Sequence, residues 1–154
     1  MFNLIIIAVG GIRNSYFKEA VNEYLKRIKP FAKVEIIEVA ATPFKSDGEI
    51  TRAKEKEGDL IISVIEKKQG DVFILDELGK ELNSEEFSNF ITTRNKQIIF
   101  VIGGTAGLSD KLKKGYKLIS LSRLTMPHEL VRVLLLEQVY RSVTMQQKRN
   151  KYNY

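Results

Sequence analysis

The chain has 154 residues, 44% of them hydrophobic and 29% charged, which is the composition of an ordinary globular domain with one core. It contains no cysteine, and this excludes a disulfide framework, a zinc finger and a thiol nucleophile. The net charge is +6, and residues 141–154 carry +4 of it because they contain no acid and four cations, Arg141, Lys148, Arg149 and Lys151. A basic end on a nearly balanced body indicates a phosphate-binding surface, with a solvated C-terminus as the alternative.

Apolar runs then alternate with helical patterns along the chain. The run Leu4–Val9, which two glycines follow, predicts a strand that is buried on both faces. This run is too short to span a bilayer, and no positively charged segment precedes it, so we expect a cytoplasmic protein without a membrane partner. Apolar residues from Phe17 to Ile28 recur at helical spacing, and Pro30 ends that helix. Val34–Val39 predicts the second strand.

The alternation continues through the rest of the sequence. The segment after Asp47 is charged and then apolar, which predicts a helix that is weakened at Gly58 and stopped at Gly70. The remaining predicted elements are strands over Val72–Leu75, Ile98–Ile102 and Lys117–Leu121, short helices after Ser84 and Ser109, and a long final helix over His128–Met145. Five strands that alternate with helices predict a single α/β domain, with a mostly parallel sheet and helices on both faces.

Ligands of such sheets bind beyond the carboxyl ends of the strands, and three segments lie there in this sequence. They are residues 75–80, 103–108 and 120–128. The second segment has three glycines in five positions, so its backbone N–H and C=O groups can approach a ligand closely. A tight strand-to-helix turn is the alternative explanation for these glycines.

Several familiar kinds of site are absent from the sequence. There is no G-x-G-x-x-G after the first strand, no phosphate-binding G-x-x-x-x-G-K-[ST] and no G-x-S-x-G nucleophile motif. The single histidine, His128, cannot form a metal site alone, and a histidine beside a proline at a helix start is more often structural than catalytic. In the final helix Glu137 and Arg141 lie one turn apart, so an ion pair explains them most simply.

Many short motifs of this sequence are weak singly but specific in their order and spacing. In these motifs the chain resembles the RlmH family of large-subunit ribosomal pseudouridine N3-methyltransferases, which are SPOUT-class enzymes. The matching segments run nearly the whole length and are Ala8-Val9-Gly10, Glu23-Tyr24, Lys26-Arg27, Lys56-Glu57-Gly58, Leu75-Asp76, Gly79-Lys80, Ser84-Glu85, Phe87, Ile102-Gly103-Gly104, Gly107-Leu108, Leu121 to His128 and Leu130 to Leu134.

The resemblance implies a fold and a reaction. The fold is a single SPOUT domain over residues 1–154, with five or six strands and a trefoil knot in the C-terminal half, over about residues 70–154. The reaction is the transfer of a methyl group from S-adenosylmethionine, without a metal, to N3 of a pseudouridine in 23S ribosomal RNA of the assembled ribosome. The family is homodimeric through the final helix, so the apolar stripe of that helix is expected to be part core and part partner surface.

The resemblance also implies the site residues. The cofactor pocket is expected to be lined by Leu75, Gly103, Gly104, Leu121, Ser122, Arg123, Leu124, Thr125 and Met126. For catalysis, Arg132 and Arg141 are candidates to stabilise the deprotonated base, with Glu137 to orient them and Tyr152 to stack on RNA. Phosphate contacts are expected from Lys148, Arg149 and Lys151.

Two segments depart from the family pattern. The family usually has proline and a larger residue where this chain has Thr105-Ala106, and its C-terminal histidine is missing after Tyr152. Three alternatives therefore stay open: a ribosome- or RNA-binding relative without catalytic activity, a SPOUT methyltransferase that acts on tRNA, and a nucleotide-binding enzyme with an ordinary doubly wound sheet and no knot.

Overall fold

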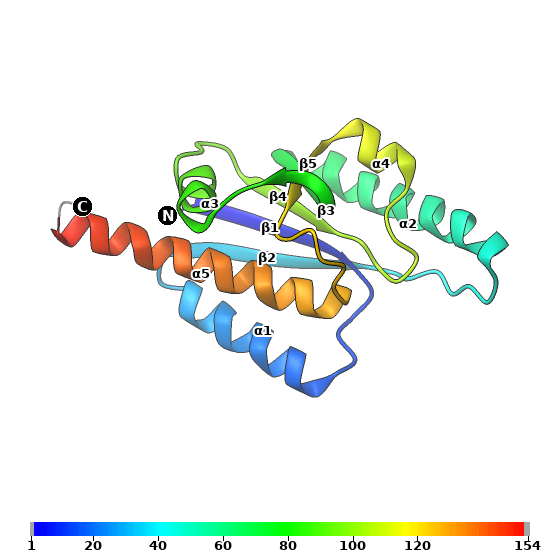
Figure 1. Cartoon of the computed structure of the whole chain (residues 1–154), viewed down its shortest axis with the longest axis horizontal. Coiled ribbons are helices and arrows are strands. Elements are labelled where there is room, and N and C mark those ends of the chain that lie inside the picture. Colours follow the sequence, from blue (N-terminus) through cyan, green and yellow to red (C-terminus); the bar gives the residue numbers. More distant parts are fainter. Residues whose placement is uncertain (1, 153–154) are drawn as a thin grey trace.

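The computed structural model describes the backbone of residues 2–152 and the side chains as far as Lys148. Five strands and five helices follow one another in the predicted order (Figure 1). The strands are β1 (Phe2–Val9), β2 (Ala32–Val39), β3 (Asp71–Glu81), β4 (Ile98–Ile102) and β5 (Lys117–Ser120), and the helices are α1 (Ser15–Ile28), α2 (Asp47–Lys68), α3 (Ser84–Thr92), α4 (Asp110–Gly115) and α5 (His128–Tyr152).

The strands form one parallel sheet in the order β2-β1-β4-β3-β5. The central strands β1 and β4 are buried on both faces, as their uninterrupted apolar sequences predict. Because all five strands run the same way, their carboxyl ends lie at one edge, where α/β sheets bind ligands. The prediction of a single α/β sheet domain is confirmed, whereas the knot stays an implication of the resemblance.

Helices cover both faces of the sheet and create two cores. One core joins α1, α3 and α5 to one face of the sheet, and alternate residues of β1 and β4 supply its centre. The other core joins α2 and α4 to the opposite face. Figure 1 shows α1 and α5 on one side of the sheet and α2 and α4 on the other. The prediction that α5 contributes to the core is thereby confirmed, since Leu135, Leu136 and Val139 are completely buried.

Two boundaries differ most from those that the sequence predicts. Strand β3 continues to Glu81 rather than ending at Leu75, because its polar second half pairs with β5 after a bulge. Helix α5 continues to Tyr152, although its last residues lack an apolar period. Helix α2 runs through Gly58, where the sequence predicts only a weak point, and this glycine allows close packing, because a Cβ there would lie 2.5 Å from Ser109 Oγ.

The start of α1 is held by a side chain from α5. Asn14 precedes the helix, and its own side chain does not cap it. Instead the buried carboxylate of Glu129 accepts hydrogen bonds from the backbone N–H groups of Arg13 (2.6 Å) and Asn14 (3.2 Å). A carboxylate at a helix N-terminus satisfies unpaired donors and complements the helix dipole. Glu129 therefore joins α1 to α5.

We expect Glu129→Ala to lower the free energy of unfolding by about 2 kcal/mol, because it leaves partly buried N–H groups without an acceptor. Urea denaturation followed by circular dichroism measures this loss. Glu66→Ala, which removes an exposed acid from α2, is the matched control and should change stability by less than about 0.5 kcal/mol. Equal stabilities of the two variants would contradict this account of α1.

Candidate functional site

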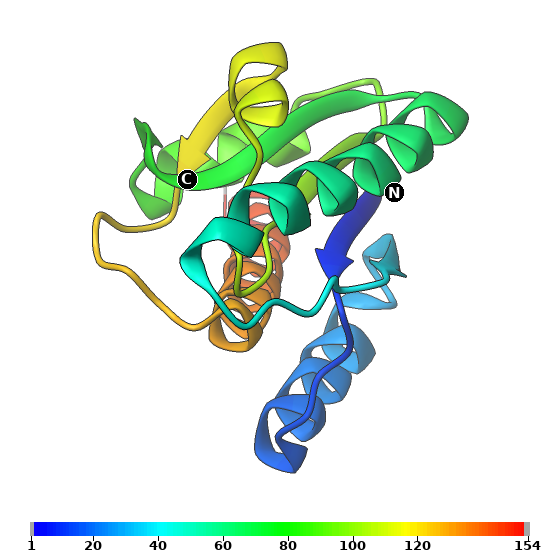
Figure 2. The ribbon, with the colours of Figure 1, turned by 90° about the vertical axis from the view of Figure 1, so that its right-hand side faces the viewer.

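A cavity of about 650 Å³ opens at the carboxyl edge of the sheet. Three segments that lie far apart in the sequence form most of its wall: the end of β3, the loop after β4, and the segment between β5 and α5. Figure 2 shows this last segment leaving the end of β5 and looping out before it reaches the start of α5. The volume is in the range of pockets that bind cofactors and other small molecules. The three segments are those that the sequence analysis placed beyond the strand ends.

The glycine loop after β4 forms the floor of the cavity with its backbone. A Cβ on Gly103 would lie 2.9 Å from Leu108 Cγ, and one on Gly104 would lie 2.8 Å from Val9 Cγ1, so neither position has room for a side chain. The N–H of Gly107, whose φ is +87°, donates a 3.0 Å hydrogen bond to Gly104 O and closes the turn. This turn therefore forms with Thr105-Ala106 in the place of the family's proline and larger residue.

A bulge at the end of β3 builds one rim. Leu75 and Lys80 both pair with Ile119 of β5, so the four residues between them leave the ladder. Asp76 Oδ1 accepts a hydrogen bond from Leu78 N (2.8 Å), and Asp76 Oδ2 forms an ion pair with Lys113 Nζ (3.3 Å). Both members of this pair line the cavity, so it presents fixed charges to a ligand.

The segment from Leu121 to Pro127 forms the opposite rim and is tied to β3. Thr125 Oγ1 donates to Glu77 Oε2 (2.7 Å), and Arg123 forms an ion pair with Glu81. Within the segment, Leu124 N donates to Ser122 Oγ (3.1 Å). The two rims are thus linked across the mouth of the cavity by side-chain contacts.

The structure brings eight of the nine expected cofactor residues together around this cavity. They are Leu75, Gly103, Gly104, Leu121, Ser122, Leu124, Thr125 and Met126. Arg123 lies in the same segment, but its exposed side chain is directed to Glu81 and does not line the cavity. The wall combines apolar side chains with exposed backbone and a few polar groups, as expected of a site for a nucleoside with a polar tail.

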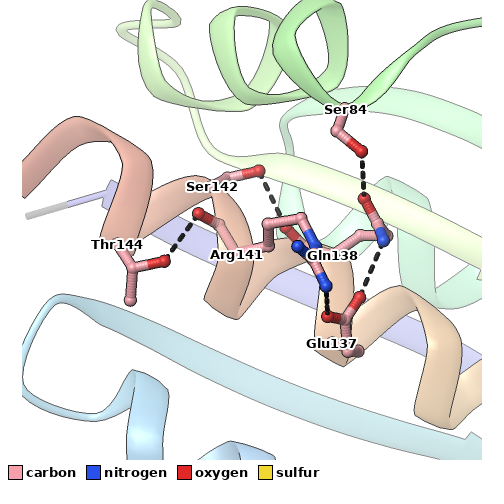
Figure 3. Close-up of polar contacts among 6 residues, drawn as sticks. All are labelled: Ser84, Glu137, Gln138, Arg141, Ser142 and Thr144. Atoms are coloured by element: carbon pink, nitrogen blue, oxygen red, sulfur yellow. Dashed lines mark hydrogen bonds and ion pairs between the residues drawn. The ribbon is translucent and has the colours of Figure 1, made fainter. Parts of the chain in front are cut away.

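Among the described side chains, the expected catalytic residues Arg132, Glu137 and Arg141 do not meet in one site. Glu137 and Arg141 form the predicted ion pair on α5, with 2.5 Å between Arg141 Nη2 and Glu137 Oε1 (Figure 3). Glu137 also accepts a hydrogen bond from Gln138, which in turn contacts Ser84 of α3. This pair lies on the surface of α5 and does not line the cavity.

Arg132 has a different environment from the one that a catalytic cation requires. Its side chain is only 3% exposed, and it donates to Glu38 Oε2 (2.7 Å) and to Gly10 O (3.0 Å). Both partners lie more than 90 residues away in the sequence, so no local pattern could reveal them. Arg132 joins α5 to the ends of β1 and β2. Of the remaining expected residues, Lys148 is exposed near the end of α5, and the side chains of Arg149, Lys151 and Tyr152 lie outside the described residues.

Sequence reasoning missed four ionisable groups of the site. Asp76 and Lys113 line the cavity as a pair, and the matching motif Leu75-Asp76 was the available signal for the acid. His128, interpreted from the sequence as more typical of a structural residue, also lines the cavity. Glu57 lies beneath the glycine loop, with one oxygen 3.7 Å from a Cβ that would stand on Gly104. The motif Lys56-Glu57-Gly58 was the available sequence signal for Glu57.

Two searches of the described residues concern other classes of site. No group of three or more His, Cys, Asp or Glu side chains that could hold a metal ion occurs among them. None of the helices between residues 2 and 152 has an apolar stretch long enough to cross a membrane.

Comparison with known proteins gives the family directly. The family described as "Predicted SPOUT methyltransferase" matches residues 2–152. "Ribosomal RNA large subunit methyltransferase H" of Clostridium botulinum (strain Kyoto / Type A2) is 45% identical over 149 residues, which are 91% of this chain and 92% of that protein. The protein of the same name from Lactobacillus helveticus is 44% identical, and 91% of this chain and 92% of the relative are covered.

Solved structures agree in fold. A structure described as "putative RNA methyltransferase from Bacillus anthracis" has a TM-score of 0.58 at 14% identity, and the match covers 92% of this chain and 95% of that one. A structure described as a "putative methyltransferase" from Legionella pneumophila, solved with the cofactor SAM, has a TM-score of 0.51 at 12% identity, and the match covers 92% of this chain and 66% of that one. At these identities the similarity concerns the fold alone. The match of the family to nearly the whole chain and the close relatives together show that this chain belongs to the SPOUT methyltransferases, in the RlmH family.

Proposed function

We propose that this chain transfers the methyl group of S-adenosylmethionine to N3 of a pseudouridine in 23S ribosomal RNA of the assembled ribosome. The observation that carries the proposal is the cavity, whose wall contains eight of the nine cofactor residues that the family resemblance predicts. The names of the relatives, which share over 40% of their residues with this chain, support the ribosomal substrate.

The residues present fit this cofactor. Leu75, Leu121 and Leu124 offer apolar surface to a purine ring, and the backbone of Gly103 and Gly104 can hydrogen-bond to its edge or to the ribose. The pair of Asp76 and Lys113 presents both charges to the polar parts of a bound nucleoside. Bound there, S-adenosylmethionine supplies an electrophilic methyl group on a sulfonium.

The protein contributes to the reaction mainly by holding the reacting groups in position and by supplying a nearby charge. A methyl transfer needs the acceptor nitrogen held close to the methyl carbon and in line with the bond that breaks, so a rigid cavity accounts for much of the acceleration. The N3 proton of the base must also leave, and a nearby cation lowers the pKa of the imide. We propose Arg141 for this part, with Glu137 to orient it, because the pair is fixed and accessible on α5. Arg132 would then act by holding α5, and Tyr152 by stacking on RNA.

A homodimer through α5 would bring this pair to a cavity. Leu130 and Leu134 are only half-buried on α5, and Leu78 (83% exposed) and Leu124 (75% exposed) stand at the rim of the cavity. Exposed apolar side chains of this kind are typical of a surface that a partner covers. We therefore propose that a second copy of the chain packs on α5, covers these leucines and shares the RNA site.

Ribosomal RNA is expected to be bound by the basic end of α5. Replacing Lys148, Arg149 and Lys151 with alanine should weaken ribosome binding and reduce the slope of log K against log salt by about 2, because each cation displaces a counterion. Filter binding of ribosomal subunits across a salt series measures the slope. The matched control replaces the exposed Lys18 and Lys26 of α1 and Lys29 at its C-cap, which removes equal charge. Unchanged affinity and slope in the first variant would contradict this docking surface.

A further inference from the structure

One buried acid remains without a role in this account. Glu57 lies on the buried side of α2, in a stripe whose other members are Ala53, Gly58, Ile61 and Ile65. It is 3% exposed, and its Oε2 accepts a hydrogen bond from the backbone N–H of Thr42 (2.8 Å). Its Oε1 is buried and has no hydrogen-bond partner among the described residues. A buried carboxylate that is half satisfied is costly, so it calls for an explanation.

The unpartnered oxygen faces the underside of the glycine loop. A Cβ on Gly104 would lie 3.7 Å from Glu57 Oε1, and a Cβ on the next residue of α2, Gly58, would lie 2.5 Å from Ser109 Oγ. One turn earlier in α2, the side chain of Lys54 lies beside Gly107, where an added Cβ would be 3.4 Å from Lys54 Cε. Helix α2 thus supports the loop from below, while Gly103, Gly104 and Gly107 line the cavity above. Gly104, whose added Cβ would point toward Glu57, is therefore also a residue of the cavity wall.

The charge of the cofactor changes during the proposed reaction. S-adenosylmethionine carries a sulfonium, an ammonium and a carboxylate, for a net charge of +1. The product, S-adenosylhomocysteine, has lost the methyl group and the sulfonium charge, so its net charge is zero. A buried carboxylate this close to the cavity wall acts on such a difference more strongly than it would in water.

We propose that Glu57 is a positioning residue whose carboxylate favours the cationic cofactor over its neutral product in the cavity above the glycine loop. This inference rests on the proposed function, because it assumes that S-adenosylmethionine binds there. It gives Glu57 a part in releasing the product and in admitting fresh cofactor. It also explains why an acid stands in an otherwise apolar or small stripe of α2.

The ionisation of Glu57 supports the proposal. Burial raises the pKa of the Glu57 carboxyl above its usual value, while the hydrogen bond from Thr42 and the charge of His128 oppose this. Among the charged groups of the surrounding elements, His128 acts on the Glu57 carboxyl, Lys54 lies beside Gly107 of the glycine loop, and Lys113 lines the cavity. A cation bound in the cavity would favour the ionised carboxylate and lower its pKa again. Binding of the cationic cofactor should therefore release protons from Glu57, and the neutral product should not.

The sign of the pH dependence follows by linkage. As the pH rises through the raised pKa of Glu57, the carboxylate forms and affinity for S-adenosylmethionine should increase, whereas affinity for the product should change little from this cause. Glu57→Gln isolates the contribution of this carboxyl, because the amide oxygen can still accept the hydrogen bond from Thr42 while the charge is lost.

The test is isothermal titration calorimetry of the full chain with each ligand. At neutral pH we expect Glu57→Gln to weaken S-adenosylmethionine about tenfold and to leave S-adenosylhomocysteine within about twofold. Glu66→Gln, on the exposed face of the same helix, should leave both affinities unchanged. Equal weakening of both ligands by Glu57→Gln, or no weakening of either, would overturn the proposal.

A second measurement uses the wild-type chain and does not depend on the variant's folding. Titrations in two mildly acidic buffers of different ionisation enthalpy give the protons released on binding. More release with S-adenosylmethionine than with the product supports the inference, and equal release overturns it. A wild-type chain that binds neither ligand would overturn the proposed function itself, which separates the two failures.

Discussion

Gly79→Ala is expected to lower the free energy of unfolding by about 3 kcal/mol and to weaken cofactor binding more than tenfold. A Cβ at this position would lie 2.5 Å from Ile119 N, 2.7 Å from Ile119 C and 2.7 Å from Leu118 C. All three atoms belong to the backbone of β5, so no side chain can rotate away and the two strands must separate. Since β5 leads directly into the segment 121–126, this separation would also move one wall of the cavity.

Chemical denaturation gives the stability change, and calorimetry with S-adenosylmethionine gives the affinity. Gly115→Ala is the matched control, because a Cβ on that glycine at the end of α4 meets nothing within 4 Å. The control should differ from the wild type by less than about 1 kcal/mol. A Gly79→Ala variant as stable as the control would show that the contact between β3 and β5 is not as tight as described.

Arg132→Met is expected to lower the free energy of unfolding by about 2 to 3 kcal/mol. The change removes a buried guanidinium with charged hydrogen bonds to Glu38 (2.7 Å) and to Gly10 O (3.0 Å), while methionine keeps much of the apolar volume. The Glu38 side chain is 46% exposed, so water can solvate it afterwards, and the loss should be smaller than for a pair buried on both sides.

Arg141→Met provides the comparison on the same helix. Its ion pair with Glu137 is exposed and joins residues one turn apart, so its loss should cost only about 0.3 to 0.5 kcal/mol. We expect the opposite order in methyl transfer: Arg141→Met should mainly reduce kcat, and Arg132→Met should act through stability. Equal stability losses, or a kcat defect confined to Arg132→Met, would contradict the roles assigned to the two arginines.

Most of the fold could be predicted because its strands are short apolar runs. Leu4–Val9 and Ile98–Ile102 are buried on both faces. An uninterrupted apolar run of this length is typical of such a strand, so the sequence alone indicates it. The second half of β3 could not be predicted, since its polar residues look like a loop and become a strand only through pairing with β5. The end of α5 was missed for a similar reason, because its polar residues lack an apolar period.

The candidate site could be predicted from the sequence only in part. The glycines after β4 and the segment after β5 could be selected from the family resemblance, and the structure shows why both stand at one cavity. The environment of Arg132 could not be predicted, because Glu38 and Gly10 reach it only through the folded chain. The position of Glu57 beneath Gly104 likewise depends on the packing of α2 against the glycine loop.

The most direct test of the central claim is a methyl-transfer assay with the purified chain. Methyl-labelled S-adenosylmethionine is incubated with ribosomes from cells that lack such a methyltransferase, and the label is then located in the RNA. The account predicts label on N3 of a single pseudouridine in large-subunit ribosomal RNA, with little or none from Gly79→Ala and near-wild-type amounts from Gly115→Ala. Label on tRNA, or ribosome binding with no label and no affinity for the cofactor, would contradict it.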